Sequence, residues 1–148
     1  MSDELQQLEE WLSPLINKLS PTERRILARE VARDLRIANR ERIKAQTNPD
    51  GTPFEPRTEL RGRSGRIRRK AMFTKLRTAK YLRIKTSADE AAVGFIGRVA
   101  RIARVHHYGL RDRVEPGGPK HHYARRELVG ITASDRERIG NKVLEHIT

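Results

Sequence analysis

The sequence predicts an α+β fold in which N-terminal helices, a central antiparallel β-hairpin or small sheet, a further helix and a C-terminal helix follow in that order. Helical spacing of apolar residues covers the first third of the chain, two short segments near its middle alternate apolar and polar residues, and a capped amphipathic segment lies near its end. The two candidate strands are adjacent in sequence, which favours α+β over a β-α-β arrangement. The 148 residues are enough for one domain with a modest core.

Residues 1–47 are predicted to be helical. A first helix should carry the apolar residues Leu5, Leu8, Trp11, Leu12, Leu15, Ile16 and Leu19, and we expect it to break or kink at Pro14. Ser20, Pro21 and Glu23 form a helix-start signature, with Ser20 as the cap and Glu23 completing a capping box. The second helix should run to about Gln46, with an apolar stripe of Leu27, Val31, Leu35, Ala38 and Ile43.

Residues 48–66 are predicted to be a flexible loop rich in Pro, Gly and Arg, which separates the helical part from an α+β part over residues 67–148. A loose helical period follows over residues 67–76. Next, Leu82 and Ile84 alternate with polar residues, and residues 91–97 form a second apolar segment. These two segments predict a hairpin.

The remaining elements are two helices and a loop between them. Residues 98–108 predict a helix with Val99, Ile102, Ala103 and either Val105 or His106 on its stripe, ended by Gly109. Residues 110–122 are Gly- and Pro-rich and predict a loop. Ser134 and Glu137 predict a second capping box, which opens a last helix with the stripe Ile139, Val143 and Ile147.

The positive charge is concentrated in one tract. The formal net charge is +13, and Arg61–Lys85 holds eleven Lys or Arg without any Asp or Glu. Such a tract attracts phosphates, acidic protein surfaces or anionic lipid. It lacks a zinc-finger, basic-zipper or RNP-like motif and offers only two aromatic residues for base stacking. Its basic positions are therefore candidate contacts to a partner or to DNA: Arg61, Arg63, Arg66, Arg68, Arg69, Lys70, Lys75, Arg77 and Lys80.

Several classes of function lack support in the sequence. The chain has no cysteine, which excludes disulfides and Cys-ligated metals, and no apolar run approaches the roughly 20 residues that span a bilayer. The acidic N-terminal residues do not resemble a signal peptide, so we expect a soluble, non-secreted protein. No nucleophile elbow, phosphate-binding loop or paired-carboxylate motif is present. We therefore expect no catalytic residue, no cofactor and no enzyme activity.

Two His-His pairs, His106-His107 and His121-His122, raise the alternative of a metal site. Adjacent residues on a helix point about 100° apart, so His106 and His107 are poorly placed to bind one ion together. We expect His106 to pack on the apolar stripe and His107 to be exposed, with no metal bound.

Three separated stretches resemble the phage virion morphogenesis family, the tail-completion proteins of contractile-tailed bacteriophages. They are NPDGTPFEPR (48–57), AAVGFIGRVARIARVHHYGL (91–110) and YARRELVGIT (123–132), and the likeness runs from about Val31 to the C-terminus. The family pattern near the end often reads Tyr-Pro-Ala-Arg-Glu-Leu-Leu-Gly, whereas Ala124 and Arg125 stand here in place of Pro-Ala. The matching positions are Pro49, Asp50, Gly51, Pro53, Phe54, Pro56, His106, Tyr108, Gly109, Tyr123, Arg126, Glu127, Leu128 and Gly130.

The resemblance implies a single tail-completion domain over residues 1–148 with a structural role in virion assembly. It implies that the protein completes the head-proximal end of a phage tail and helps to join tail to head. The implied partners are other tail and neck proteins and further copies of the chain in a ring, with contact to packaged DNA and none to membrane. The implied location is the virion, after assembly in the host bacterial cytoplasm. The alternative is a non-specific nucleic-acid-binding protein that uses residues 61–85.

Overall fold

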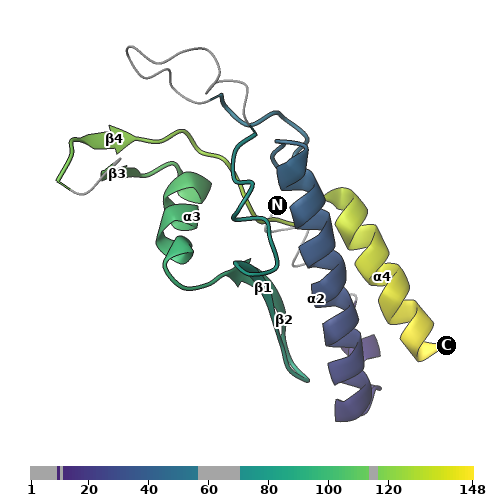
Figure 1. Ribbon diagram of the computed structural model, residues 1–148. Helices are drawn as coiled ribbons and strands as arrows, with labels where there is room; N and C mark the ends of the chain where they lie inside the picture. The colour runs from purple at the N-terminus through teal and green to yellow at the C-terminus, as the bar shows by residue number, and fades with distance from the viewer. Residues whose placement is uncertain (1–9, 11, 57–70, 114–116) are drawn as a thin grey trace. The chain divides into compact units, whose positions relative to one another are not determined.

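In the part of the chain that the structure describes, helices and two small sheets make up the fold, which confirms the α+β prediction (Figure 1). The computed structural model describes residues 10, 12–56, 71–113 and 117–148. The elements that lie wholly within the described residues are α2 (Pro21–Lys44), β1 (Leu82–Thr86), β2 (Ala91–Phe95), α3 (Val99–Tyr108), β3 (Arg111–Arg113), β4 (Lys120–His122) and α4 (Ala133–Ile147). The described residues divide into two compact units, each with its own apolar core.

The first unit comprises residues 1–38, 84–93 and 131–148. Its core contains Leu12, Leu19, Leu27, Leu35, Ile139 and Val143. Helices α2 and α4 run antiparallel within it. Asp34 accepts from Arg138, whereas Glu30, about one turn earlier in α2, pairs with His146, about two turns later in α4. The apolar stripes predicted for the two helices therefore face each other.

The helix boundaries follow the local sequence, with two corrections. Ser20 Oγ accepts the Glu23 N–H at 3.2 Å, so α2 begins as predicted. The expected break at Pro14 is wrong, because residues 12–16 are helical. The cap of α4 is Thr132, whose hydroxyl accepts the Asp135 N–H while Asp135 accepts the Thr132 N–H.

The second unit comprises residues 39–83 and 94–130. Its core contains Ile43, Phe54, Met72, Leu76, Ala103 and Leu128. Residues 71–80 form turns instead of the helix suggested by their loose period. Ile102 is 50% exposed, so it does not belong to the buried stripe of α3. Gly109 ends α3 in the left-handed conformation, with φ of 65°, as its sequence position predicted.

Both sheets have two strands. The predicted hairpin is confirmed as β1 and β2, and the Ser87 N–H donates to the Glu90 carbonyl in the turn between them. The second sheet was not predicted: residues 110–122 contain strands β3 and β4, which pair antiparallel with Arg111 opposite His122 and Arg113 opposite Lys120. The prediction of a loop was wrong here because strands of three charged or polar residues show no apolar alternation.

Candidate functional site: the motif cluster

The residues that carry the family resemblance gather in the second unit. They come from the turn after α2, from the end of α3 and from the extended segment 123–130. We call these three segments together the motif cluster. Its geometry shows what most of these residues do, because each segment is held to the others by hydrogen bonds from a few polar side chains.

Arg126 joins the three segments of the motif cluster. Its side chain is only 4% exposed. Its Nε donates to the Glu55 carbonyl at 2.7 Å and its Nη2 to the Pro56 carbonyl at 3.0 Å. Its backbone N–H donates to the His106 carbonyl at 2.8 Å. A buried guanidinium must be hydrogen-bonded, so this residue fixes backbone positions and is not available to a ligand.

Arg42 and Asn39, from the last turns of α2, complete these connections and were not singled out from the sequence. Arg42 donates to the carbonyls of Glu127 and Leu128, each at 2.8 Å, and to the Asn39 side-chain oxygen at 2.9 Å. That oxygen also accepts the Gly130 N–H at 2.9 Å. The signal that could have found Asn39 is its position: a polar residue midway between Leu35 and Ile43 on the apolar stripe.

Two motif glycines are required by close packing. A Cβ at Gly130 would lie 2.5 Å from Pro49 Cγ, and a Cβ at Gly109 would lie 2.9 Å from the Arg125 backbone nitrogen. Both distances are too short for carbon to occupy. These positions, and Pro49 with them, therefore serve the packing of the motif cluster.

The turn that contains Asp50 is held by its own side chains. Asp50 Oδ1 accepts from the Thr52 hydroxyl and from the Thr52 N–H, which lowers the pKa of this carboxyl. Gly51 has φ of 89°, and Pro53 pairs with Thr47 in an isolated bridge. Asp50 thus has the role of a turn residue, although it is exposed.

An aromatic row runs through the motif cluster. Neighbouring rings lie 4.8 to 5.7 Å apart in the order Phe54, Phe73, His106, Tyr123 and His121. His106 is therefore packed, as predicted. His107 was expected to be exposed and is half-buried; burial lowers its pKa, and its Nδ1 has no hydrogen-bond partner in the described residues. Tyr108 is 58% exposed and is thus the motif aromatic available at the surface.

The basic tract is described only in part. Lys75 and Lys80 are exposed and Arg77 is half-buried, whereas Met72 and Leu76 beside them enter the core of the second unit. Six further positions lie outside the described residues: Arg61, Arg63, Arg66, Arg68, Arg69 and Lys70.

No arrangement typical of metal binding occurs in the described parts of the chain. They contain no group of three or more His, Asp or Glu side chains placed to hold an ion. They also contain no helix long and apolar enough to cross a bilayer.

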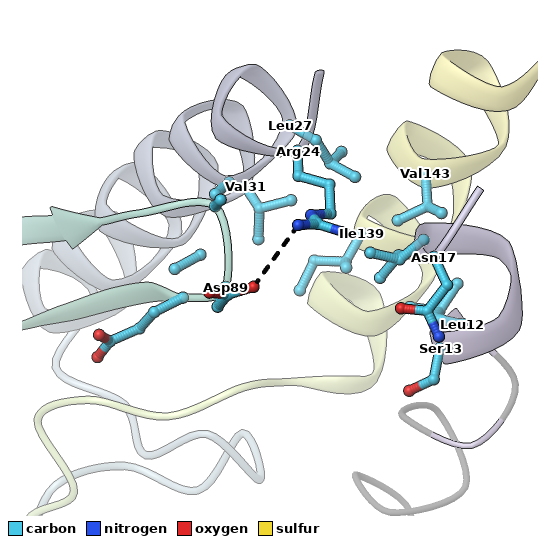
Figure 2. A pocket seen from close by; sticks show the side chains of 14 residues that line it. Leu12, Ser13, Asn17, Arg24, Leu27, Val31, Asp89, Ile139 and Val143 are labelled. Carbon is cyan, nitrogen blue, oxygen red and sulfur yellow. Dashed lines mark ion pairs between the residues drawn. The ribbon is translucent and has the colours of Figure 1, made fainter. Parts of the chain in front are cut away.

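The first unit contains a pocket of about 380 Å³ between α2, α4, residues 12–17 and the turn of the first hairpin (Figure 2). Its walls are mainly apolar, with Leu27, Val31 and Ile139 among them. Arg24 extends toward Asp89 at 3.9 Å, a long ion pair with an exposed carboxylate. The described lining residues include no histidine, and their carboxylates are those of Asp89 and Glu90 in the turn of the hairpin.

Comparisons with known proteins agree with the motifs. The model of the phage virion morphogenesis family matches residues 3–148. The protein described as "Tail completion protein S" of Escherichia phage P2 is 39% identical over 148 residues, which cover 98% of each chain. No solved structure matches the chain.

Proposed function

The chain belongs to the phage virion morphogenesis family, and on that premise we propose that it completes the head-proximal end of a phage tail and helps to join the tail to the head. The observation that carries this proposal is the likeness to the phage P2 tail completion protein over nearly the full length of both chains. Relatives alike over their whole length share a fold and usually the surfaces by which they assemble.

The geometry supports a structural role. Arg126, Arg42 and Asn39 use their polar atoms to hold backbone segments together. Such residues build a scaffold whose function lies in its surfaces. We infer that several copies form a ring in the virion, as repeated neck and tail components do, and that they meet other tail and neck proteins after assembly in the host cytoplasm.

Genetic complementation tests this proposal. A phage that lacks the gene should accumulate separate heads and tails, and supplying the wild-type chain should restore joined, infectious particles. Electron microscopy of the lysate counts the two classes. Joined and infectious particles in the absence of the protein would contradict the proposed role.

The second candidate is non-specific binding to nucleic acid, favoured by the eleven basic residues of Arg61–Lys85. It predicts affinity for short duplexes that falls steeply with salt, because bound phosphates release counterions. Charge reversal at Arg68, Arg69 and Lys70 separates the two functions. Loss of duplex binding with normal joining would favour the nucleic-acid function, whereas loss of joining by a variant with unchanged duplex affinity would favour a protein partner.

A further inference from the structure

The β3–β4 hairpin has two faces of different character. Residues that lie opposite each other in a sheet share a face with the residues two positions further along each strand. The register therefore gathers four exposed residues on one face, with Arg111 opposite His122 and Arg113 opposite Lys120. We call these four residues the basic face. The remaining strand residues, Asp112 and His121, lie on the other face and are half-buried.

The face that contains Asp112 and His121 is engaged within the protein. Asp112 Oδ1 accepts from Arg101 Nη2 of helix α3 at 2.8 Å. The His121 ring lies 4.8 Å from the Tyr123 ring, which in turn packs on His106 of α3. Both contacts connect this face to α3 or to a residue that packs on it. The basic face is therefore the side of the hairpin that points away from α3.

The charges of the basic face are not neutralised. Within the described residues, the side chains of Arg111, Arg113 and Lys120 form no ion pair. Arg113 Nη1 donates to the Gly118 carbonyl at 2.6 Å, which orients the guanidinium and leaves its charge in place. Like charges directly opposite each other, as in Arg113 and Lys120, destabilise a sheet. An anion bound to this face would remove that repulsion.

The composition of the basic face favours phosphate groups over a protein surface. The six strand residues include no apolar side chain, whereas the core of a protein interface is apolar and depleted in lysine. Four side chains are also few beside the about 20–30 residues that each partner contributes to a stable protein interface. Contacts to phosphates, in contrast, need only donors such as Arg and Lys, and a two-stranded ribbon is narrow enough to enter the major groove of DNA.

We propose that the basic face binds the phosphate backbone of double-stranded DNA, without preference for sequence. The three Arg and Lys side chains supply the charge, and the His122 ring supplies a further hydrogen-bonding group. This surface shares no residue with the basic tract Arg61–Lys85. The inference also goes beyond the proposed function, because it follows from the hairpin alone and would hold if the protein joined other parts of a virion.

Duplex binding by a neutralised variant tests the proposal. Variant A carries Arg111→Gln, Arg113→Gln and Lys120→Gln, and fluorescence anisotropy measures its affinity for short labelled duplexes at several salt concentrations. Its affinity at low salt should be at least tenfold below that of wild type. The slope of log affinity against log salt should become shallower by about 3, because each lost phosphate contact removes about 0.9. Two duplexes of unrelated sequence should be affected equally, since phosphates carry no sequence information.

A matched control and a second measurement keep the result specific. Variant B, with Lys18→Gln, Arg25→Gln and Arg29→Gln, loses the same charge at exposed positions outside the hairpin. It should keep the salt slope of wild type. Residues 61–85 are unchanged in both variants, so the binding that A retains measures the contribution of the basic tract. In wild-type protein, NMR should show that added duplex shifts the amide signals of β3 and β4, and circular dichroism should show that A is folded.

Four outcomes would overturn the proposal. They are wild-type protein that binds no duplex at low salt, a variant A with wild-type affinity and slope, a variant B as weak as A, and amide signals of β3 and β4 that do not move. If A binds duplex normally but fails to restore joined particles, the basic face belongs to an acidic protein partner and the proposal is wrong. If wild-type protein restores joined particles without binding duplex, the inference fails while the proposed function stands.

Discussion

Replacing Asn39 by leucine should destabilise the second unit even though the two side chains are similar in size. Asn39 is 1% exposed, and its side-chain oxygen accepts from the Gly130 N–H and from Arg42, each at 2.9 Å. Leucine would keep the volume filled and remove the oxygen that accepts both hydrogen bonds. The change therefore separates hydrogen bonding from packing.

The magnitude follows from the lost partners. Leaving a buried donor unsatisfied costs about 1–3 kcal/mol, so two donors give about 2–6 kcal/mol. Burying leucine in place of asparagine returns up to about 2 kcal/mol, and its better helix propensity returns a few tenths. A net loss of up to about 4 kcal/mol remains, out of a total stability of about 5–15 kcal/mol. For a chain of this length it lowers Tm by up to about 12 °C.

Two assays check the effect of Asn39→Leu. Urea unfolding gives the free energy of unfolding, and amide exchange by NMR should show faster exchange at the Gly130 N–H in particular. Asn39→Asp is the control, because its carboxylate keeps an oxygen in the acceptor position beside the Arg42 guanidinium; it should be more stable than Asn39→Leu. If Asn39→Leu is as stable as wild type with normal exchange at Gly130, hydrogen bonding through Asn39 does not hold the motif cluster together.

Three further predictions concern other parts of the structure. Gly130→Ala should lower the free energy of unfolding by about 1–3 kcal/mol, because its Cβ would meet Pro49 Cγ at 2.5 Å. In a double-mutant unfolding cycle, adding Pro49→Ala should recover part of that loss. Losses that simply add would contradict the contact between the two residues. Burial lowers the pKa of His107, so the unfolded chain binds more protons below its ordinary pKa of about 6.5, and stability should fall as pH drops through and below that value. His107→Gln should flatten this part of the urea-derived stability profile, and an unchanged slope would assign the effect to other groups. Thr132→Ala should lower the free energy of unfolding by about 1 kcal/mol, and Ser134→Ala should lower it by less than about 0.5 kcal/mol, as measured by thermal unfolding. The reverse order would show that Ser134 is the cap of α4, as the sequence predicted.

The sequence predicted elements wherever periodicity and local chemistry agree. Helix α2 could be recognised from its cap Ser20, α3 from Gly109 at its end, and the first hairpin from the apolar–polar alternation around Leu82. Each of these signals depends only on residues close together in the sequence. Thr132 and Ser134 each have an acidic residue three positions later, so the sequence allows either of them to cap α4. The backbone geometry shows that the cap is Thr132.

The motif cluster was predictable as a set of positions but not as an arrangement. Arg126 and Glu55 are 71 residues apart, and Asn39 and Gly130 are 91 apart. No local pattern reports such pairings, because they depend on how the chain folds back on itself.

The β3–β4 hairpin has a consequence for behaviour at high concentration. Two strands alone leave both outer edges of a sheet open, and open edges invite pairing with other chains. Here Arg111, Asp112, Arg113 and Lys120 occupy those strands, and charged side chains oppose edge-to-edge pairing. The hairpin can therefore stand in solvent without seeding aggregates. Any contact it makes must be selected by side chains, and not by the backbone of whichever strand lies nearby.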